Sequence, residues 1–360
     1  MPDPAHPAAV MPTASPDDAA ETLNRGGLVG LPTETVYGVA ARADLPGAMA
    51  RLRELKQVGP DERFALHLSN ADAALAALPA PSRWLERLLR KALPGPVTFE
   101  VHPSDGGPPV TLRCPDHPLT QRLLRAAAGP VVAASATPRG ARPALDADAA
   151  ALALGPAADA VLDGGRCRFG RPSTLVQLKP LGDGSTTVHQ SASPDGRYHV
   201  TVVRSGVIDE RMLRNMQTTH LLFVCTGNTC RSPMAEAVAK KRLEGKPDVR
   251  VGSAGVYAGE GQSASAEAVD AMRELGIDLS GHRSRPLSND LIRAADRIFT
   301  MTESHRQAVL AQAPHAADKV VRLDEDRDID DPYGAGPDVY RRTARQIETA
   351  LEQRLTEQLS

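Results

Sequence analysis

Short apolar runs alternate with Ala-, Leu- and Arg-rich stretches through the first part of the chain. Runs of this kind, bounded by Gly, Pro and polar residues, are typical of β-strands, and the longer stretches between them are typical of helices. The alternation therefore predicts a mixed α/β domain. The predicted strands occupy residues 26–32, 64–69, 97–102, 110–114, 129–135 and 173–178.

A second alternating region begins near residue 219, where the apolar run HLLFVC precedes a glycine turn and a helical stretch. Residues between Leu178 and Arg197 are rich in Gly, Asp, Ser, Thr and Pro, but the strand-like run at 198–208 follows them. We therefore expect a loop inside the first domain there. The predicted organisation is a leader over residues 1–18, one domain over 19–213, a linker over 214–218 and a second domain over 219–360.

The last helix is predicted to begin at Pro337, directly after Gly336, because proline favours the first helical position. Apolar residues then recur at intervals of four, which is typical of a helix that packs one face on a sheet. These residues are Ile347, Leu351, Leu355 and Leu359.

The bulk composition limits the possible partners. A length of 360 residues is long for one hydrophobic core and agrees with two domains. The formal net charge of -2 gives no electrostatic reason to expect DNA binding, so any link to RNA is expected to be indirect. Residues 1–18 lack the basic start and apolar stretch of a signal peptide and are interpreted as a disordered leader. No apolar run approaches the roughly 20 residues that cross a bilayer, so no membrane partner is expected.

The chain has four cysteines, and they form no CxxC pair and have no histidine partners at zinc spacing. This pattern indicates neither a disulfide framework nor a structural metal, and no metal ligands are predicted. A reducing, cytoplasmic location fits it. The cysteines are Cys114, Cys167, Cys225 and Cys230.

A Cys and an Arg six positions apart stand between a predicted strand and a predicted helix. Residues 221–224 form a buried-strand run that ends at Cys225, and Arg231 lies just before Pro233 at the expected helix start. Such a loop directs backbone N–H groups inward above a helix N-terminus, which favours binding of a phosphate dianion. Because Gly227 permits the tight turn, the sequence predicts a phosphate-binding loop over residues 225–232.

The residue types in this loop favour nucleophilic chemistry. Its positive field is expected to lower the pKa of Cys225 and give a thiolate. The Arg231 guanidinium can bind two phosphate oxygens at once, which lysine cannot do. A leaving group needs a proton from a carboxylic acid, and Asp331, restrained by the following Pro332, is the candidate.

The segments VCTGNTCRSP, SAG at residues 253–255 and DPYG resemble the low-molecular-weight protein-tyrosine phosphatase family over residues 219–358. The resemblance implies an open parallel-sheet α/β domain that needs no cofactor and acts on a phosphorylated protein through a cysteinyl-phosphate. It implies that Cys225 is the nucleophile, Arg231 the transition-state clamp and Asp331 the general acid. It also assigns the loop residues Thr226, Gly227, Asn228, Thr229, Cys230 and Ser232, with Asn228 and Ser232 shaping the loop and stabilising the thiolate.

Cys230 has two interpretations. It is either a small residue that fills space in the loop or, as the family resemblance implies, a partner that forms a reversible disulfide with Cys225. His282 is interpreted as a structural residue.

The phosphorylated residue stays open between phosphotyrosine and phosphoarginine. Family members with Ile or Leu at the position of Thr229 resemble tyrosine phosphatases. In contrast, CTGNTCRS together with MTESH and an aromatic residue after Asp-Pro resembles the bacterial protein-arginine phosphatase branch. A polar, β-branched side chain beside the nucleophile is expected to orient attack on a phosphoramidate. Thr229 and Tyr333 are therefore predicted to set substrate selectivity.

Four segments of the first domain resemble the YrdC/Sua5 family over about residues 20–213: GLPTETVYG, LPGPVTF, VTLRCPDHP and PSTLVQL. The resemblance implies a twisted α/β domain with a basic concavity that makes threonylcarbamoyl-AMP from threonine, bicarbonate and ATP, with Mg²⁺. That reaction is a step toward threonylcarbamoyladenosine in tRNA. The resemblance implies a threonine pocket at Thr33 and Thr35. The residues that it places toward the nucleotide are Lys56, Arg113, Ser135, Ser173, Thr174 and Arg204.

Two positions depart from the pattern of that family. Where the family has Lys-x-Arg, this chain has Lys56 and Val58, and where the family has Ser-x-Asn, it has Ser135 and Thr137. Two polar contacts to ATP are therefore expected to be missing, each with a cost in transition-state binding. Two interpretations follow: an active synthase, or a degenerate domain that binds a nucleotide, threonine or RNA and regulates the phosphatase.

Overall fold

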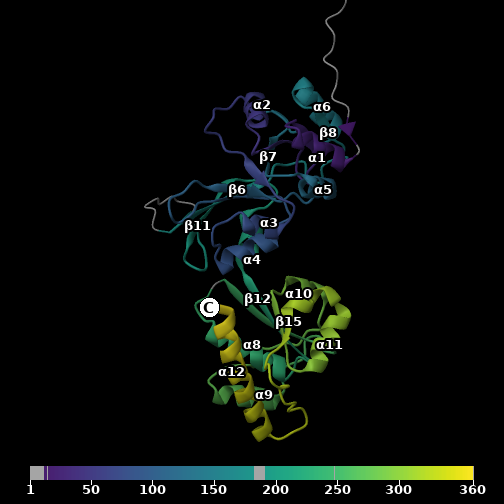
Figure 1. The fold of residues 1–360 in the computed structure, drawn as a ribbon. Helices are drawn as coiled ribbons and strands as arrows, with labels where there is room; N and C mark the ends of the chain where they lie inside the picture. The colour runs from purple at the N-terminus through teal and green to yellow at the C-terminus, as the bar shows by residue number, and fades with distance from the viewer. Residues whose placement is uncertain (1–11, 14, 182–190, 247, 360) are drawn as a thin grey trace, which may run out of the picture. The chain divides into compact units, whose positions relative to one another are not determined.

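The structure is a computed structural model that describes residues 12–13, 15–181, 191–246 and 248–359. The chain divides into two compact units, Met1–Gln217 and Thr218–Ser360 (Figure 1). The division falls directly after a helix, Glu210–Gln217, so most of the residues predicted as a linker are helical in the structure. Among the described residues, no helix is both long and apolar enough to cross a membrane.

The first unit is built around one mixed sheet with helices against it. Its strand order is β1-β8-β2-β3-β7-β4-β6-β5-β9-β11-β10, with both parallel and antiparallel neighbours. The elements are β1 Pro12–Thr13, α1 Pro16–Asn24, β2 Val29–Leu31, β3 Gly38–Arg42, α2 Pro46–Lys56, β4 Ala65–His67, α3 Ala71–Ala76, α4 Arg83–Ala92, β5 Val97–Val101, β6 Val110–Arg113, α5 Pro118–Ala126, β7 Val131–Ser135, α6 Ala147–Leu154, β8 Ala160–Leu162, β9 Thr174–Pro180, β10 Ser191–Ala192, β11 Tyr198–Arg204 and α7 Glu210–Gln217.

Most of the sequence-based expectations for this unit agree with the structure. Each of the six predicted apolar runs contains a strand, which confirms the mixed α/β class. The expected leader lies largely outside the described residues, but residues 16–18 form the first turn of α1 and are not part of a leader. Ser15 caps this helix, since its hydroxyl accepts a hydrogen bond from the Asp18 N–H. The centre of the expected loop, residues 182–190, also lies outside the described residues.

The second unit is an open sheet of parallel strands in the order β13-β12-β14-β15. This confirms the predicted fold class. The final helix begins at Pro337, as predicted, and Ile347 and Leu351 are buried in the core. The elements are β12 Thr219–Cys225, α8 Arg231–Arg242, β13 Val249–Gly255, α9 Ala266–Glu274, α10 Asn289–Ala294, β14 Arg297–Thr300, α11 Glu303–Gln312, β15 Val320–Arg322 and α12 Pro337–Leu359.

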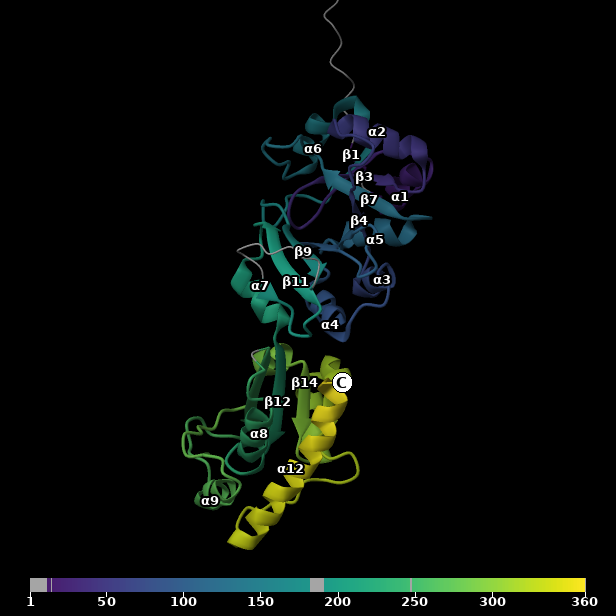
Figure 2. The same ribbon diagram turned by 90° about the vertical axis from the view of Figure 1, so that its left-hand side faces the viewer.

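Strand β12 is buried on both faces. Its residues from Leu221 to Cys225 are all apolar, with no alternation between apolar and polar side chains. Leu221 and Phe223 pack into a core with α8, α9 and α12, whereas Leu222 and Val224 pack into a second core with α10 and α11. Figure 2 labels α8, α9 and α12 around the strands of this unit. Covering of both faces is typical of parallel sheets. Cys225 is therefore held at the carboxyl end of a rigid central strand.

Candidate active site

The phosphate-binding loop connects the end of β12 to the start of α8. Cys225 pairs with Gly255 of β13, and Arg231 is the first residue of α8. Gly255 has to be glycine, because a Cβ there would collide with the Thr226 carbonyl oxygen and lie 2.8 Å from the Asn228 nitrogen. The SAG segment thus supplies the space in which the loop folds back toward β13.

Asn228 holds the loop in its shape. Its φ of 55° lies in the left-handed region, which asparagine tolerates better than most residues. Its backbone carbonyl lies 2.8 Å from Nε2 of His282, which agrees with the structural interpretation of that histidine. Its side-chain Oδ1 accepts a hydrogen bond from the Arg285 N–H at 2.9 Å.

That last contact fixes the direction of the hydrogen bonds around the nucleophile. Because Oδ1 of Asn228 faces an N–H donor, Nδ2 of the same amide donates to the hydroxyls of Ser232, at 2.9 Å, and Ser253, at 2.8 Å. Ser253 in turn donates to Glu236 Oε2 at 2.5 Å. The Ser232 hydroxyl proton can then point at Cys225 Sγ, 2.9 Å away, and the Ala254 carbonyl oxygen, at 3.4 Å, is a more distant acceptor for it.

The protonation of Cys225 differs from the sequence-based expectation. Burial raises the pKa of the Cys225 thiol, and this effect is larger than those that oppose it. The opposing effects are the hydrogen bonds from Ser232 and from the Asn228 N–H and the positive charge of Arg231. The predicted lowering of this pKa is therefore not found, because the thiol is withdrawn from water.

Arg231 and Asp331 meet at the mouth of the loop. The Arg231 guanidinium is buried, donates from Nη2 to Asp331 Oδ2 at 2.7 Å and from Nη1 to the Ile329 carbonyl at 3.3 Å. The Asp331 side chain is 55% exposed, so it is accessible to a ligand from solvent. The structure thus brings together the three residues that the sequence predicted as catalytic.

A small cavity of about 360 Å³ opens beside this pair. Its wall includes Thr226 of the loop and His305 of α11, whose Nε2 lies 2.8 Å from Thr226 Oγ1. The sequence analysis used the segment MTESH only as a family mark and assigned no role to His305. The spacing of 79 positions between His305 and Thr226 hides this contact from any local pattern.

The remaining predicted loop residues lie around this centre. All four cysteines are free, and Cys230 Sγ lies 3.5 Å from the hydroxyls of Tyr340 and Ser265, a contact that fits its space-filling interpretation. Thr229 is half-buried, with its Oγ1 3.7 Å from Cys230 Sγ. Tyr333 is 81% exposed, and its N–H donates to Asp331 Oδ1 at 3.2 Å.

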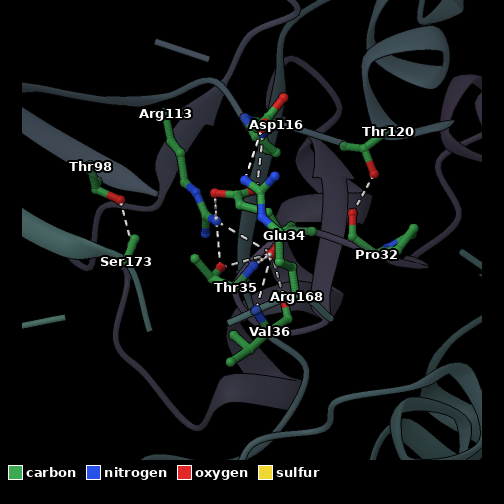
Figure 3. Close-up of polar contacts among 12 residues, drawn as sticks. Pro32, Glu34, Thr35, Val36, Thr98, Arg113, Asp116, Thr120, Arg168 and Ser173 are labelled. Atoms are coloured by element: carbon green, nitrogen blue, oxygen red, sulfur yellow. Dashed lines mark hydrogen bonds and ion pairs between the residues drawn. The ribbon is translucent and has the colours of Figure 1, made fainter. Parts of the chain in front are cut away.

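The first unit contains a larger cavity, of about 590 Å³. Arg113 reaches toward the 33–35 turn at its wall, where its Nη2 donates to Thr35 Oγ1 at 2.5 Å and to Glu34 Oε1 at 3.1 Å (Figure 3). The arginine and the glutamate are both buried, so their charges compensate each other away from water. Nε of Arg113 is buried without a hydrogen-bond partner among the described residues.

The other predicted nucleotide residues divide into those at the cavity and one away from it. Lys56, Ser135, Ser173 and Arg204 line the cavity with Thr33 and Arg113. Thr174 does not, because its buried hydroxyl donates to the Ile208 carbonyl at 2.6 Å. Thr35 lies behind the wall and contacts Arg113.

Lys56 contacts the backbone of the segment that departs from the family pattern. Its ammonium donates to the carbonyl oxygens of Ser135, at 2.8 Å, and Thr137, at 2.6 Å. Burial and the nearby Arg139 lower the pKa of Lys56. Arg204 similarly donates to the Ser173 carbonyl, with Nε at 3.2 Å. Among the described residues, no group of three or more His, Cys, Asp or Glu side chains is placed to hold a metal ion.

Comparison with known proteins gives two families. The family described as low molecular weight phosphotyrosine protein phosphatase matches residues 220–360. The Sua5/YciO/YrdC family, described as "Telomere recombination", matches residues 21–190.

The curated relatives that match the second unit include two protein-arginine-phosphatases and a protein-tyrosine-phosphatase. A protein-arginine-phosphatase of Geobacillus stearothermophilus is 43% identical over 39% of this chain and 95% of its own length. A protein-arginine-phosphatase of Bacillus subtilis is 42% identical over 37% of this chain and 92% of its own length. The low molecular weight protein-tyrosine-phosphatase Etp of Escherichia coli is 34% identical over 39% of this chain and 95% of its own length. The chain therefore belongs to the low molecular weight phosphotyrosine protein phosphatase family through residues 220–360, and residues 21–190 are similar to the Sua5/YciO/YrdC family.

Proposed function

We propose that the second unit removes phosphate from a phosphorylated protein with Cys225 as the nucleophile. The observation that carries the proposal is the convergence of Cys225 Sγ, the Ser232 hydroxyl and the Arg231–Asp331 pair around one loop. The loop N–H groups and the Arg231 guanidinium would hold the phosphoryl oxygens. The hydrogen bonds from these donors become stronger as negative charge develops on the oxygens in the transition state. Metal ions and organic cofactors have no part in this mechanism.

The reaction has two displacement steps. In the first, the Cys225 thiolate attacks phosphorus, the bond to the leaving group breaks, and Asp331 donates its proton to the leaving atom. In the second, the Asp331 carboxylate takes a proton from water, the hydroxide attacks phosphorus, and the S–P bond breaks to return the thiolate and release phosphate. Because burial raises the pKa of Cys225, the hydrogen bond from Ser232 would increase the thiolate fraction at a given pH.

Replacement of the nucleophile tests the proposal. Cys225→Ser should abolish release of phosphate from phosphopeptides, because the serine hydroxyl is not ionised at neutral pH. The matched control is Cys167→Ser, a buried free cysteine of the first unit, which should leave turnover unchanged. Turnover that survives in Cys225→Ser would contradict the proposal.

The substrate proposed for this site is phosphoarginine, with phosphotyrosine as the alternative. Two of the relatives are named protein-arginine-phosphatases, and a third is named a protein-tyrosine-phosphatase. Thr229, a half-buried polar residue of the loop, supports the phosphoarginine assignment. Thr229→Ile should lower kcat/KM for a phosphoarginine peptide relative to a phosphotyrosine peptide, and an unchanged ratio would show that Thr229 only packs.

We further propose that the cavity of the first unit binds a nucleotide. The supporting observation is a volume of about 590 Å³ lined by the cations of Lys56, Arg113 and Arg204 and by the Ser173 hydroxyl. Such a wall suits ATP, with Mg²⁺ entering on its phosphates, together with threonine and bicarbonate. If the protein releases pyrophosphate from ATP in the presence of threonine and bicarbonate, the first unit is an active threonylcarbamoyl-AMP synthase, which serves tRNA modification. Nucleotide binding without pyrophosphate release identifies the regulatory alternative.

A further inference from the structure

His305 is a buried histidine whose two ring nitrogens both have hydroxyl partners. Nε2 lies 2.8 Å from Thr226 Oγ1, and Nδ1 lies 2.7 Å from Thr302 Oγ1. Thr302 is the N-cap of α11, whereas Thr226 follows the nucleophile directly. The His305 side chain thus joins the phosphate-binding loop to a helix that the mechanism above does not use.

The lowered pKa of His305 favours a neutral imidazole at neutral pH. Burial lowers the pKa of His305 to about 4, and the charge of Arg231 acts in the same direction, while Asp331 and Asp328 act against it. A neutral imidazole has one N–H donor and one nitrogen acceptor. One of the two threonine hydroxyls must therefore donate to the ring, and the other must accept from it.

Ser304 provides an acceptor for one of the two arrangements. The Thr302 hydroxyl lies 2.8 Å from Ser304 Oγ, where either hydroxyl can donate to the other. Its oxygen also accepts from the His305 backbone N–H at 3.2 Å. With its proton directed at Ser304, Thr302 Oγ1 accepts the Nδ1–H of His305. Nε2 then accepts the Thr226 hydroxyl proton.

This arrangement determines what Thr226 Oγ1 can offer to a ligand. Once its proton is bound to Nε2, this oxygen presents only lone pairs. Thr226 is exposed and lines the same small cavity as Arg231 and Asp331, where the leaving group must meet the general acid. A phosphorylated guanidinium group carries N–H donors that match such an acceptor, whereas the esterified phenolic oxygen of phosphotyrosine carries no donor.

We propose that His305 is a positioning residue for substrate selectivity, which holds Thr226 Oγ1 as a hydrogen-bond acceptor for the guanidinium N–H groups of phosphoarginine. The proposal rests on the phosphatase function proposed above and adds a determinant that is separate from Thr229. Discrimination of this kind is effective because a donor on the substrate finds its partner only when the acceptor is correctly oriented.

Thr226→Val tests the acceptor, since valine keeps the shape of threonine and removes the hydroxyl. In the full chain, kcat/KM for a phosphoarginine peptide should fall about tenfold more than kcat/KM for a phosphotyrosine peptide. Thr226→Ser, which retains the hydroxyl, should keep the ratio of the wild-type protein. An equal loss on both substrates, or no loss on either, would overturn the proposal.

A double-mutant cycle tests the action of His305 through Thr226. His305→Leu should lower the ratio as Thr226→Val does, and the double variant should lose no more than either single variant. His305→Gln, which can still accept a hydrogen bond, should restore part of the ratio. Additive losses would mean that His305 acts independently of Thr226 and would overturn the proposal.

The tautomer gives a readout that does not depend on turnover. Nitrogen NMR shifts of the His305 ring at neutral pH should show Nδ1 protonated and Nε2 as an acceptor, and the opposite tautomer would overturn the proposal. The underlying function fails separately, if Cys225→Ser retains turnover. When Cys225→Ser is inactive but Thr226→Val keeps the wild-type ratio, only the role of His305 and Thr226 is wrong.

Discussion

Arg231 Nη2 lies 2.7 Å from Asp331 Oδ2, although 100 positions separate the two residues in the chain. The contact aims the buried guanidinium from the start of α8 toward the loop that carries the predicted acid. In the proposed reaction the same guanidinium binds phosphoryl oxygens, so the ion pair keeps the clamp and the proton donor in one place before substrate arrives. The ion pair contributes little to stability, because water screens the half-exposed Asp331, so its main effect is to orient the two side chains.

Arg231→Lys should therefore impair catalysis strongly, although lysine retains the positive charge of arginine. Lysine cannot hold two oxygens in one plane and cannot reach Asp331 and the Ile329 carbonyl together. We expect kcat/KM to fall by about two to three orders of magnitude, with weaker inhibition by orthophosphate. Arg327→Lys, at an exposed arginine paired with Asp324, is the control and should behave as the wild type. A loss below about threefold would argue against a bidentate clamp.

Ser232→Ala should raise the pKa of Cys225 further. The Ser232 hydrogen bond is the largest of the effects that lower this pKa, so its removal leaves burial less opposed. The thiolate fraction at a fixed pH should fall. The pH profile of Cys225 alkylation by iodoacetamide should move to higher pH than in the wild type. Ser263→Ala, at an exposed serine of the same unit, serves as the comparison, and a profile that moved to lower pH would refute the assigned direction of the bond.

Gly255→Ala should distort the phosphate-binding loop. The added Cβ would meet the Thr226 carbonyl oxygen and the Asn228 nitrogen, both of which are backbone atoms that cannot rotate away. Overpacking of this kind costs about 1–3 kcal/mol, and the strain should also weaken orthophosphate binding. Calorimetric unfolding and phosphate titration measure the two effects. Gly281→Ala, where no atom lies within 4 Å of the added Cβ, should change neither.

The stability of the first unit should fall with acid because of His67. Burial and the nearby Arg113 lower the pKa of His67 from 6.5 to about 3. Between these two values the unfolded chain binds a proton that the folded unit does not bind. The free energy of unfolding should therefore decrease as pH falls through this window, by up to about 1.4 kcal/mol per pH unit from this group.

The single tryptophan of the chain makes this measurable. Trp84 is buried in the first unit, so its fluorescence follows urea unfolding of that unit alone. His67→Gln should lose less stability than the wild type as pH falls from about 6.5 toward about 4.5. Parallel losses in the two proteins would show that other groups carry the pH dependence.

The phosphate-binding loop could be predicted from sequence because its chemistry is local. Cys225, Arg231 and the residues between them are consecutive, and one strand–loop–helix pattern positions all of them. Asp331 lies far away in the chain, and it was connected to the loop by the need for a proton donor and by the family motif, not by a local pattern. No pattern connected His305 to Thr226, since their contact depends on where β12 and α11 begin and end.

Burial and the alternation of side chains along an extended segment explain the two clearest differences between expectation and structure. The sequence indicates the donors around Cys225 but not the burial of its thiol, so it predicts a lowered pKa where the structure gives a raised one. Ser173 and Thr174 were both placed toward the nucleotide. Neighbouring residues of an extended segment point to opposite sides, and here Ser173 lines the cavity whereas Thr174 turns to Ile208.

Trapping of the covalent intermediate tests the central claim most directly. Asp331→Asn, given 4-nitrophenyl phosphate, does not need the general acid for the first step because its leaving group is a weak base, but it lacks the base for the second step. Rapid quenching followed by peptide mass analysis should show one phosphoryl group on Cys225 and a burst of nitrophenol. Phosphate release without a burst, or a phosphoryl group on any other residue, would contradict the proposed mechanism.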